Sequence, residues 1–289
     1  MIYFTLPNFI EQNDINTAIA ALVRRYPDKT RVKGVRIIEQ TGGIPYHCWN
    51  GSINSNVGNG VYYSDLVNVQ NCISLNARIN CANVLLEDFD FYDNFSQTIL
   101  KIFDESSTAL EISSIPLMEQ IQEKYPTYQF MFSKSADLIT PFTQDILNEI
   151  AKSGRFYKIG IPDRLSRDME WLSGLKKKSL YEITVDPICP IDCPEICQCA
   201  YKEQLNQLQY SGISTICSCN KTVPMYSNQQ ILSLEDIQDN YLSKGFQYYV
   251  FSPCYIGDLN AKISFYITYF FKPEDQSQML TEALTMLKF

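Results

Sequence analysis

The sequence of 289 residues contains a single histidine, His47. A metal site with two histidine ligands is therefore excluded, and a cysteine peptidase would have to use this one imidazole as its base. Cys48 is a poor partner for it, because the side chains of adjacent residues usually diverge. Walker, Rossmann, G-x-S-x-G and H-E-x-x-H motifs are absent as well. Thiol peptidase activity is thus the weakest hypothesis.

Long apolar segments are also missing, since no stretch approaches about 18 uninterrupted apolar residues. The N-terminal residues MIYFTLP have neither the basic region nor the long apolar region of a signal peptide. We therefore expect a cytoplasmic protein that does not associate with a membrane. The formal net charge of −8 argues against a broad basic surface for nucleic acid. A local basic cleft is compatible with this charge, so RNA and protein partners both stay open.

Cysteine, in contrast, is abundant, with ten residues in the chain. In a reducing compartment, clustered thiols more often indicate metal or redox chemistry than disulfides. Six of them fall in the segment 187–223, which has few apolar residues to form a core, so a bound ligand is expected to fix it. These candidate metal ligands are Cys189, Cys193, Cys197, Cys199, Cys217 and Cys219.

The spacing of these cysteines narrows the chemistry. Cys189, Cys193 and Cys197 follow a C-x3-C-x3-C pattern, whereas radical-SAM enzymes use C-x3-C-x2-C, so radical-SAM chemistry is disfavoured. Thiolates at short spacings suit an iron–sulfur cluster and tetrahedral zinc equally well. A third interpretation, in which several unrelated thiols are simply buried, also stays open.

Short apolar runs alternate with capped amphipathic stretches, a pattern typical of βα units around a parallel sheet. The sequence predicts helices with start signals at Ser114, Thr140 and Ser233, over Leu117–Lys124, Phe142–Lys152 and Leu234–Ser243. We predict an α/β fold, a TIM-like (β/α) barrel in a single domain over residues 1–289, with an irregular insertion at 42–80 and a Cys-rich loop at 187–223. The barrel could be incomplete or distorted, because an eighth strand rests on the weak run Gly212–Ile216. The other predicted strands are Ile2–Thr5, Ala82–Leu86, Ala109–Ile112, Gln129–Phe132, Tyr157–Ile161, Tyr181–Val185 and Gln247–Phe251.

Acidic residues follow several predicted strands and form a second group of candidates. Glu87 comes after Ala82–Leu86, Asp163 after Ile161 and Asp186 after Val185. In a barrel, these positions line the mouth at the carboxyl ends of the strands, where a carboxylate can bind a cation or act as a base. Helix capping and loop solvation are the alternative explanation for them. We therefore treat Glu87, Asp163 and Asp186 as additional candidate ligands.

Three segments together are similar to the collagenase-like U-32 peptidase family. They are the strand Tyr181–Val185 leading into Cys189 and Cys193, the segment Leu232–Ile237, and the segment Gly245–Val250. More closely, the chain resembles a branch of barrel proteins from gut bacteria and their phages. The resemblance implies a TIM-like barrel in which, in several relatives, four cysteines hold an iron–sulfur cluster. It also implies oxygen-independent hydroxylation of RNA bases or of a quinone precursor.

On that resemblance Cys189 and Cys193 match the first family cysteines, and Cys217 or Cys219 matches a later one. The chain departs from the family at Gln238, where a cysteine is usual, and Cys254 could replace that ligand. Charged family residues are also absent from Tyr249–Pro253. The first hypothesis is an iron–sulfur enzyme that modifies RNA or a small aromatic substrate. The alternative is a non-catalytic, phage-borne binding or structural protein with structural zinc or buried thiols.

Overall fold

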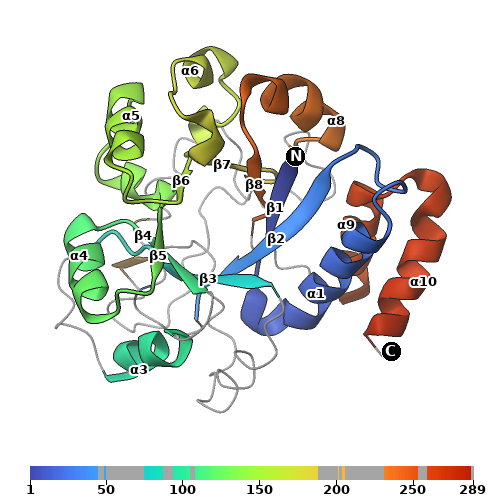
Figure 1. The fold of residues 1–289 in the computed structure, drawn as a ribbon, viewed down its shortest axis with the longest axis horizontal. Helices are drawn as coiled ribbons and strands as arrows, with labels where there is room; N and C mark the ends of the chain where they lie inside the picture. The colour runs from blue at the N-terminus through green and yellow to red at the C-terminus, as the bar shows by residue number, and fades with distance from the viewer. Residues whose placement is uncertain are drawn as a thin grey trace.

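A closed barrel of eight parallel strands forms the centre of the protein (Figure 1). The computed structural model describes residues 1–44, 49, 75–86, 94–104, 108–187, 201, 204–205, 231–252 and 259–287. Each strand pairs with its successor, and the last pairs with the first, which confirms the predicted TIM-like barrel. The strands are β1 (Ile2–Leu6), β2 (Val35–Gly42), β3 (Asn76–Cys81), β4 (Thr108–Ile112), β5 (Gln129–Phe132), β6 (Lys158–Gly160), β7 (Tyr181–Thr184) and β8 (Tyr248–Val250).

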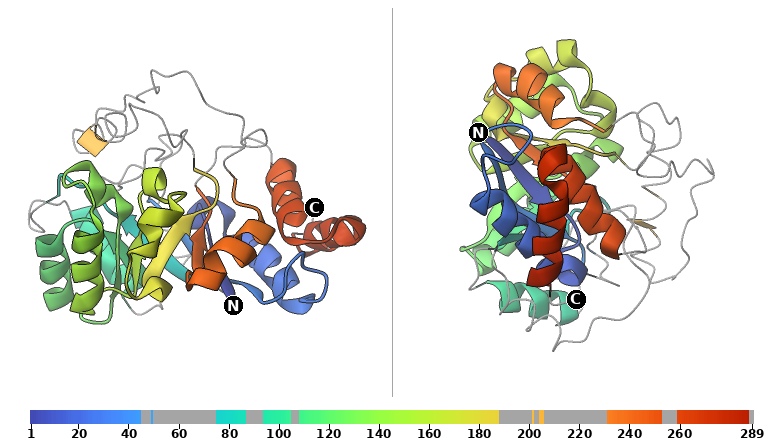
Figure 2. Two further views of the ribbon diagram at one scale, coloured as in Figure 1. Left: turned by 90° about the horizontal axis from the view of Figure 1, so that it is seen from above. Right: turned by 90° about the vertical axis from the view of Figure 1, so that its right-hand side faces the viewer.

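Helices surround the barrel on its outer side (Figure 1). The last two lie beside the first in the views of Figures 1 and 2, in agreement with the contacts among the three. The helices are α1 (Phe9–Arg25), α3 (Asn94–Phe103), α4 (Ile115–Lys124), α5 (Gln144–Ser153), α6 (Met169–Ser173), α8 (Leu234–Asp236), α9 (Leu259–Phe270) and α10 (Gln276–Met286). Among the described residues, no helix is long and apolar enough to cross a membrane.

Six of the seven predicted strands correspond to β1 and to β4 through β8, with ends that differ by at most one residue. The predicted strand Ala82–Leu86 is wrong. β3 ends at Cys81, and Asn83 then turns the chain, because its side-chain oxygen accepts a hydrogen bond of 3.0 Å from the backbone N–H of Leu85. The run Gly212–Ile216 lies outside the described residues, and the barrel closes without it.

Neither β2 nor β3 was predicted, and the reason is the polarity of the barrel interior. In both strands the side chains point alternately out of the barrel and into it, but an inward-facing position carries a charge: Glu39 in β2 and Arg78 in β3. A search for apolar strands passes over such segments. The predicted insertion 42–80 therefore contains most of β3. Most of its remaining residues lie outside those that the structure describes.

The predicted helix at Phe142–Lys152 is α5, which begins two residues later. Thr143 caps it, rather than Thr140, by accepting a hydrogen bond from the backbone of Ile146. The backbone N–H of Phe142 instead donates to Asp137 at 2.6 Å, which keeps that residue outside the helix. The caps predicted at Ser114 and Ser233 are confirmed for α4 and α8.

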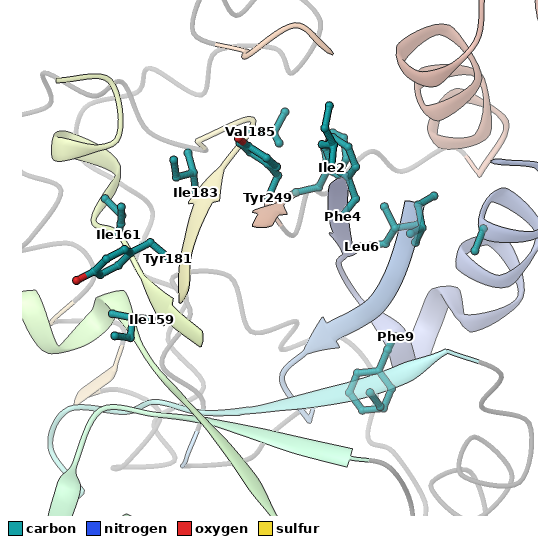
Figure 3. Close-up of a cluster of buried hydrophobic side chains, with 14 of the residues drawn as sticks. Ile2, Phe4, Leu6, Phe9, Ile159, Ile161, Tyr181, Ile183, Val185 and Tyr249 are labelled. Carbon is teal, nitrogen blue, oxygen red and sulfur yellow. The ribbon is translucent and has the colours of Figure 1, made fainter. Parts of the chain in front are cut away.

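The apolar core lies between the strands and the helices. Alternate residues of each strand point outward, and Figure 3 shows such side chains from β1, β6, β7 and β8. Aromatic rings are prominent in this layer: the ring centre of Phe4 in β1 lies 5.1 Å from that of Phe270 in α9, and the ring centre of Phe251 lies 5.0 Å from that of Tyr269. With the core on the outer face, the inner face of the barrel is left to polar residues.

Candidate functional site

Four charged side chains fill the middle of the barrel: Glu39, Arg78, Lys158 and Glu182. We call them the charged layer. Each is at most 5% exposed at its side chain. Arg78 lies 2.7 Å from both Glu39 and Glu182, and Lys158 lies 2.8 Å from Glu39 and 3.0 Å from Glu182. Two cations thus bridge two carboxylates from across the barrel, around the hydroxyl of Thr5.

The two carboxylates of the charged layer are ionised near neutral pH. Burial alone would raise the pKa of Glu182, but attraction by Arg78 and Lys158 outweighs it and lowers the pKa to about 2. The pKa of Glu39 is lowered in the same way, against the effect of its burial, by Arg78 and Lys158. Buried charges that are paired and hydrogen-bonded in this manner form a fixed unit. Because each charge of this layer is already paired, the layer is better suited to a structural role than to a catalytic one.

Aromatic rings lie below the charged layer, toward the amino ends of the strands. The hydroxyl of Tyr157 donates to Glu39 at 2.6 Å, and the rings of Tyr3 and Tyr248 stack at 5.5 Å. The Lys158 ammonium lies 4.8 Å from the centre of the Tyr248 ring, within cation–π range. This filling leaves the carboxyl end of the barrel, which we call the mouth, as the candidate site, as is usual in barrels of this kind.

A polar connection runs from the charged layer to the mouth. The Arg78 Nε atom lies 3.3 Å from Glu111 on β4, and the other Glu111 oxygen accepts a 2.7 Å hydrogen bond from Ser133. Ser133 follows β5 and caps the 3-10 turn Lys134–Leu138 through the backbone N–H of Ser135. The position of this turn is therefore tied to the barrel interior.

Lys134 is the first residue of that turn, and its ammonium reaches the ends of two further strands. It donates to Asp163 after β6 at 2.7 Å and to Thr184 of β7 at 2.8 Å. Its side chain is 35% exposed, compared with 14% for Asp163. Gly160 allows this approach, because an added Cβ would lie 2.9 Å from the backbone nitrogen of Lys134.

Asp186 lies two residues beyond the end of β7 and is 4% exposed. One carboxyl oxygen accepts a 2.6 Å hydrogen bond from the backbone N–H of Ser252, which follows β8. The other oxygen has no hydrogen-bond partner among the described residues. Burial, with a smaller effect of Asp163, raises the pKa of Asp186 to about 8, although Ser252 and Lys134 act in the opposite direction. At neutral pH the buried carboxyl is thus mainly protonated.

The structure places Asp163 and Asp186 at the mouth, each already bound by a neighbour. Their role as additional ligands stays a prediction. Outside the described residues lie His47, Glu87, Cys254 and the six clustered cysteines, Cys189, Cys193, Cys197, Cys199, Cys217 and Cys219. Among the residues that the structure does describe, no group of three or more His, Cys, Asp or Glu side chains could hold a metal. A metal centre would therefore have to include residues outside the described ranges.

The sequence prediction missed Lys134, Glu111 and the charged layer. A signal for part of it exists in the segment Tyr181–Thr184, where Glu182 stands between two apolar residues of a strand. A charge at a position that alternation assigns to the interior of a barrel requires a partner of opposite sign. The partner itself comes from a distant segment: Arg78 and Glu182 are 104 residues apart in the chain.

The comparisons with known proteins bear on the fold. No protein-family model matches the sequence, and no curated protein is significantly similar to it. Among solved structures, the chain is similar to the U32 peptidase Mk0906, with a TM-score of 0.53 and 10% sequence identity over 88% of this chain and 94% of that one. The two proteins share a barrel fold. At this identity the likeness shows the fold alone, which is the fold that the resemblance implied; the branch in gut bacteria and phages stays a prediction.

Proposed function

We propose that this protein is a U32-like barrel enzyme that binds an iron–sulfur cluster through its Cys-rich segment. It acts at the mouth, on RNA or on a small aromatic substrate, by oxygen-independent hydroxylation. The observation that carries the proposal is the hydrogen bond of 2.6 Å from Ser252 to Asp186. This bond joins the ends of β7 and β8, from which the chain continues toward two of the candidate ligands.

Chain geometry allows these two cysteines to lie within reach of one another. Cys189 comes three residues after Asp186, and Cys254 comes two residues after Ser252. Consecutive Cα atoms are about 3.8 Å apart, so Cys189 starts within about 11 Å of Asp186 and Cys254 within about 8 Å of Ser252. This supports Cys254 as the ligand that replaces the family cysteine missing at Gln238.

The chemistry of the donors fits such a cluster. Iron–sulfur clusters are held by thiolates, which the segment 187–223 supplies at short spacings. The described carboxyl groups at the mouth have other partners, since Lys134 binds Asp163 and Ser252 binds Asp186. When bound, an iron–sulfur cluster supplies one-electron transfer.

Around that centre, the residues of the mouth would bind and orient the substrate. The protonated Asp186 carboxyl offers a hydrogen-bond donor, and Lys134 offers a cationic one. Hydroxylation without O2 replaces a C–H bond by C–OH with an oxygen from water; two electrons leave the substrate, and two protons are released from the substrate and the water together. A one-electron acceptor protein is the class of co-reactant that this balance requires.

Anaerobic purification tests the proposal. We expect a brown protein that contains iron and acid-labile sulfide, and loss of both in the Cys189→Ser and Cys254→Ser variants. Cys81→Ser is the matched control, because Cys81 is buried on β3 and belongs to no candidate ligand set. Small RNAs and aromatic metabolites from cells with and without the active protein are then compared by mass spectrometry for the gain of one oxygen atom.

The non-catalytic alternative rests on Gln238. This residue is exposed in the π-helical turn Ile237–Tyr241, where its side chain takes the place of the usual cysteine. A colourless protein that carries zinc, or no metal, would refute the iron–sulfur enzyme and favour the alternative. In that case the cysteine variants should lose thermal stability through loss of the zinc.

A further inference from the structure

Two turns at the mouth lock one another through reciprocal ion pairs. They are Lys134–Leu138, after β5, and Asp163–Leu165, after β6, and we call them the turn pair. Lys134 of the first binds Asp163 of the second at 2.7 Å. Arg164 of the second binds Asp137 of the first with two hydrogen bonds, of 2.6 Å and 2.9 Å. Each turn thus supplies one cation and one carboxylate to the other.

This arrangement fixes the ammonium of Lys134 more firmly than a surface lysine. Asp163 and Thr184 hold the ammonium, Gly160 lies against its backbone, and Ser133 ties its turn to the interior. An ammonium has three N–H donors, and among the described residues Asp163 and Thr184 are the two acceptors that it contacts. A partly exposed cation that is held in place in this way has little conformational entropy left to lose on binding.

We propose that Lys134 anchors the substrate by binding an anionic oxygen of a small molecule, a carboxylate or a phosphate. The proposal deepens the proposed function, since it assumes that the substrate binds at the mouth. Asp163, Thr184 and Arg164 are positioning residues in it. They orient the ammonium, whose remaining N–H donates to the anion.

A small anion fits these observations better than RNA does. RNA binding relies on several cationic contacts to phosphates, and the chain carries a net charge of −8. The second cation of the turn pair, Arg164, already donates twice to Asp137. Arg167, which is near, donates to the backbone oxygens of Thr184 and Val185. Of the cations named at the mouth, Lys134 is therefore the one that we assign to the anionic ligand.

Calorimetric titration with matched probes tests the assignment on the anaerobically purified full chain. Benzoate and phenyl phosphate carry the two anionic groups, and benzamide is a neutral molecule of similar shape to benzoate. We expect benzoate or phenyl phosphate to bind more tightly than benzamide. Lys134→Gln should lower the affinity for the anion by about tenfold, because one charge-assisted hydrogen bond is lost. Lys134→Arg should restore part of the affinity. Lys152→Gln, on the exposed side of α5, should change nothing.

Three outcomes overturn the inference: wild-type protein that binds neither anion, Lys134→Gln protein that binds them unchanged, or a Lys134 dependence found only for a short RNA. Unfolding temperature and metal content are recorded for every preparation. Metal-free wild-type protein with Lys134-dependent benzoate binding would refute the iron–sulfur proposal and leave this one standing. Iron-containing Lys134→Gln protein with unchanged anion binding would do the reverse.

Discussion

The charged layer and the mouth differ in how completely their polar groups are paired. In the charged layer every charge faces a partner of opposite sign within 3.0 Å and is almost entirely buried. At the mouth, Lys134 is partly exposed, and one oxygen of Asp186 has no partner among the described residues. Saturated polar groups stabilise one structure, whereas polar groups with remaining capacity can bind a ligand. The contrast separates scaffold from candidate site within one barrel.

The largest loss of stability on substitution is expected from Arg78→Met. Removal of the guanidinium leaves Glu39 and Glu182 with Lys158 as their one cation in the layer and takes the Arg78 ion pair from Glu111, so the free energy of unfolding should fall by about 3–5 kcal/mol. Urea unfolding measures this loss. Lys134→Met is the matched control, because its ammonium is partly exposed, and it should lower stability by no more than about 1 kcal/mol. Equal losses in both variants would show that the two regions do not differ in this way.

Prediction from sequence succeeded for the barrel and failed for the charged layer, for one physical reason. Alternation of apolar residues reports the outer face, which packs under helices, so strands such as Gln129–Phe132 were found. Glu39 and Arg78 break the apolar pattern of β2 and β3, and their pairing follows only from closure of the barrel. A pattern within one segment contains no information about which distant charge lies opposite.

Two residues at the mouth could be predicted from the sequence, because strand ends are visible in it. Asp163 and Asp186 lie three and two residues beyond the ends of β6 and β7, and the rule that carboxyl ends gather functional groups selects both. Lys134 also follows a predicted strand, but a lone lysine after a strand looks like ordinary loop solvation. Its significance depends on Asp163 and Thr184, which reach it from other strands.

A second prediction concerns pH and Asp186→Asn. In the folded protein the pKa of Asp186 is raised to about 8, while the unfolded value is near 3.8, so the folded state binds more protons between these values. The wild type should therefore lose stability as pH rises from about 4 to about 8, by at most about 1.4 kcal/mol per pH unit from this group. Asparagine cannot ionise and keeps the oxygen that accepts from Ser252.

Unfolding curves of the wild type and Asp186→Asn at several pH values provide the measurement. The free energy of unfolding of the variant should rise steadily relative to that of the wild type up to about pH 8, and the difference should then stay constant. Glu182 supplies the opposite behaviour: its pKa is lowered to about 2, so its stabilisation is present above pH 4.5 and is lost as pH falls toward 2. A constant difference between the two proteins from pH 5 to 8 would mean that Asp186 is not held protonated.

Gly160→Ala should lower stability less than Arg78→Met does, and it addresses the link between the two regions. The new methyl carbon would meet the backbone nitrogen of Lys134 at 2.9 Å, and backbone cannot yield as a side-chain end can, so the turn must move. We expect a loss of about 1–3 kcal/mol, as for an overpacked core. Anion affinity should also fall, because the ammonium leaves the position that Asp163 and Thr184 define. Gly174→Ala is the matched control: its methyl meets the end of the flexible Gln144 side chain rather than backbone, and anion binding should be unchanged. If Gly160→Ala binds benzoate as the wild type does, the position of Lys134 does not determine affinity, and the mouth would tolerate more movement than its hydrogen bonds indicate.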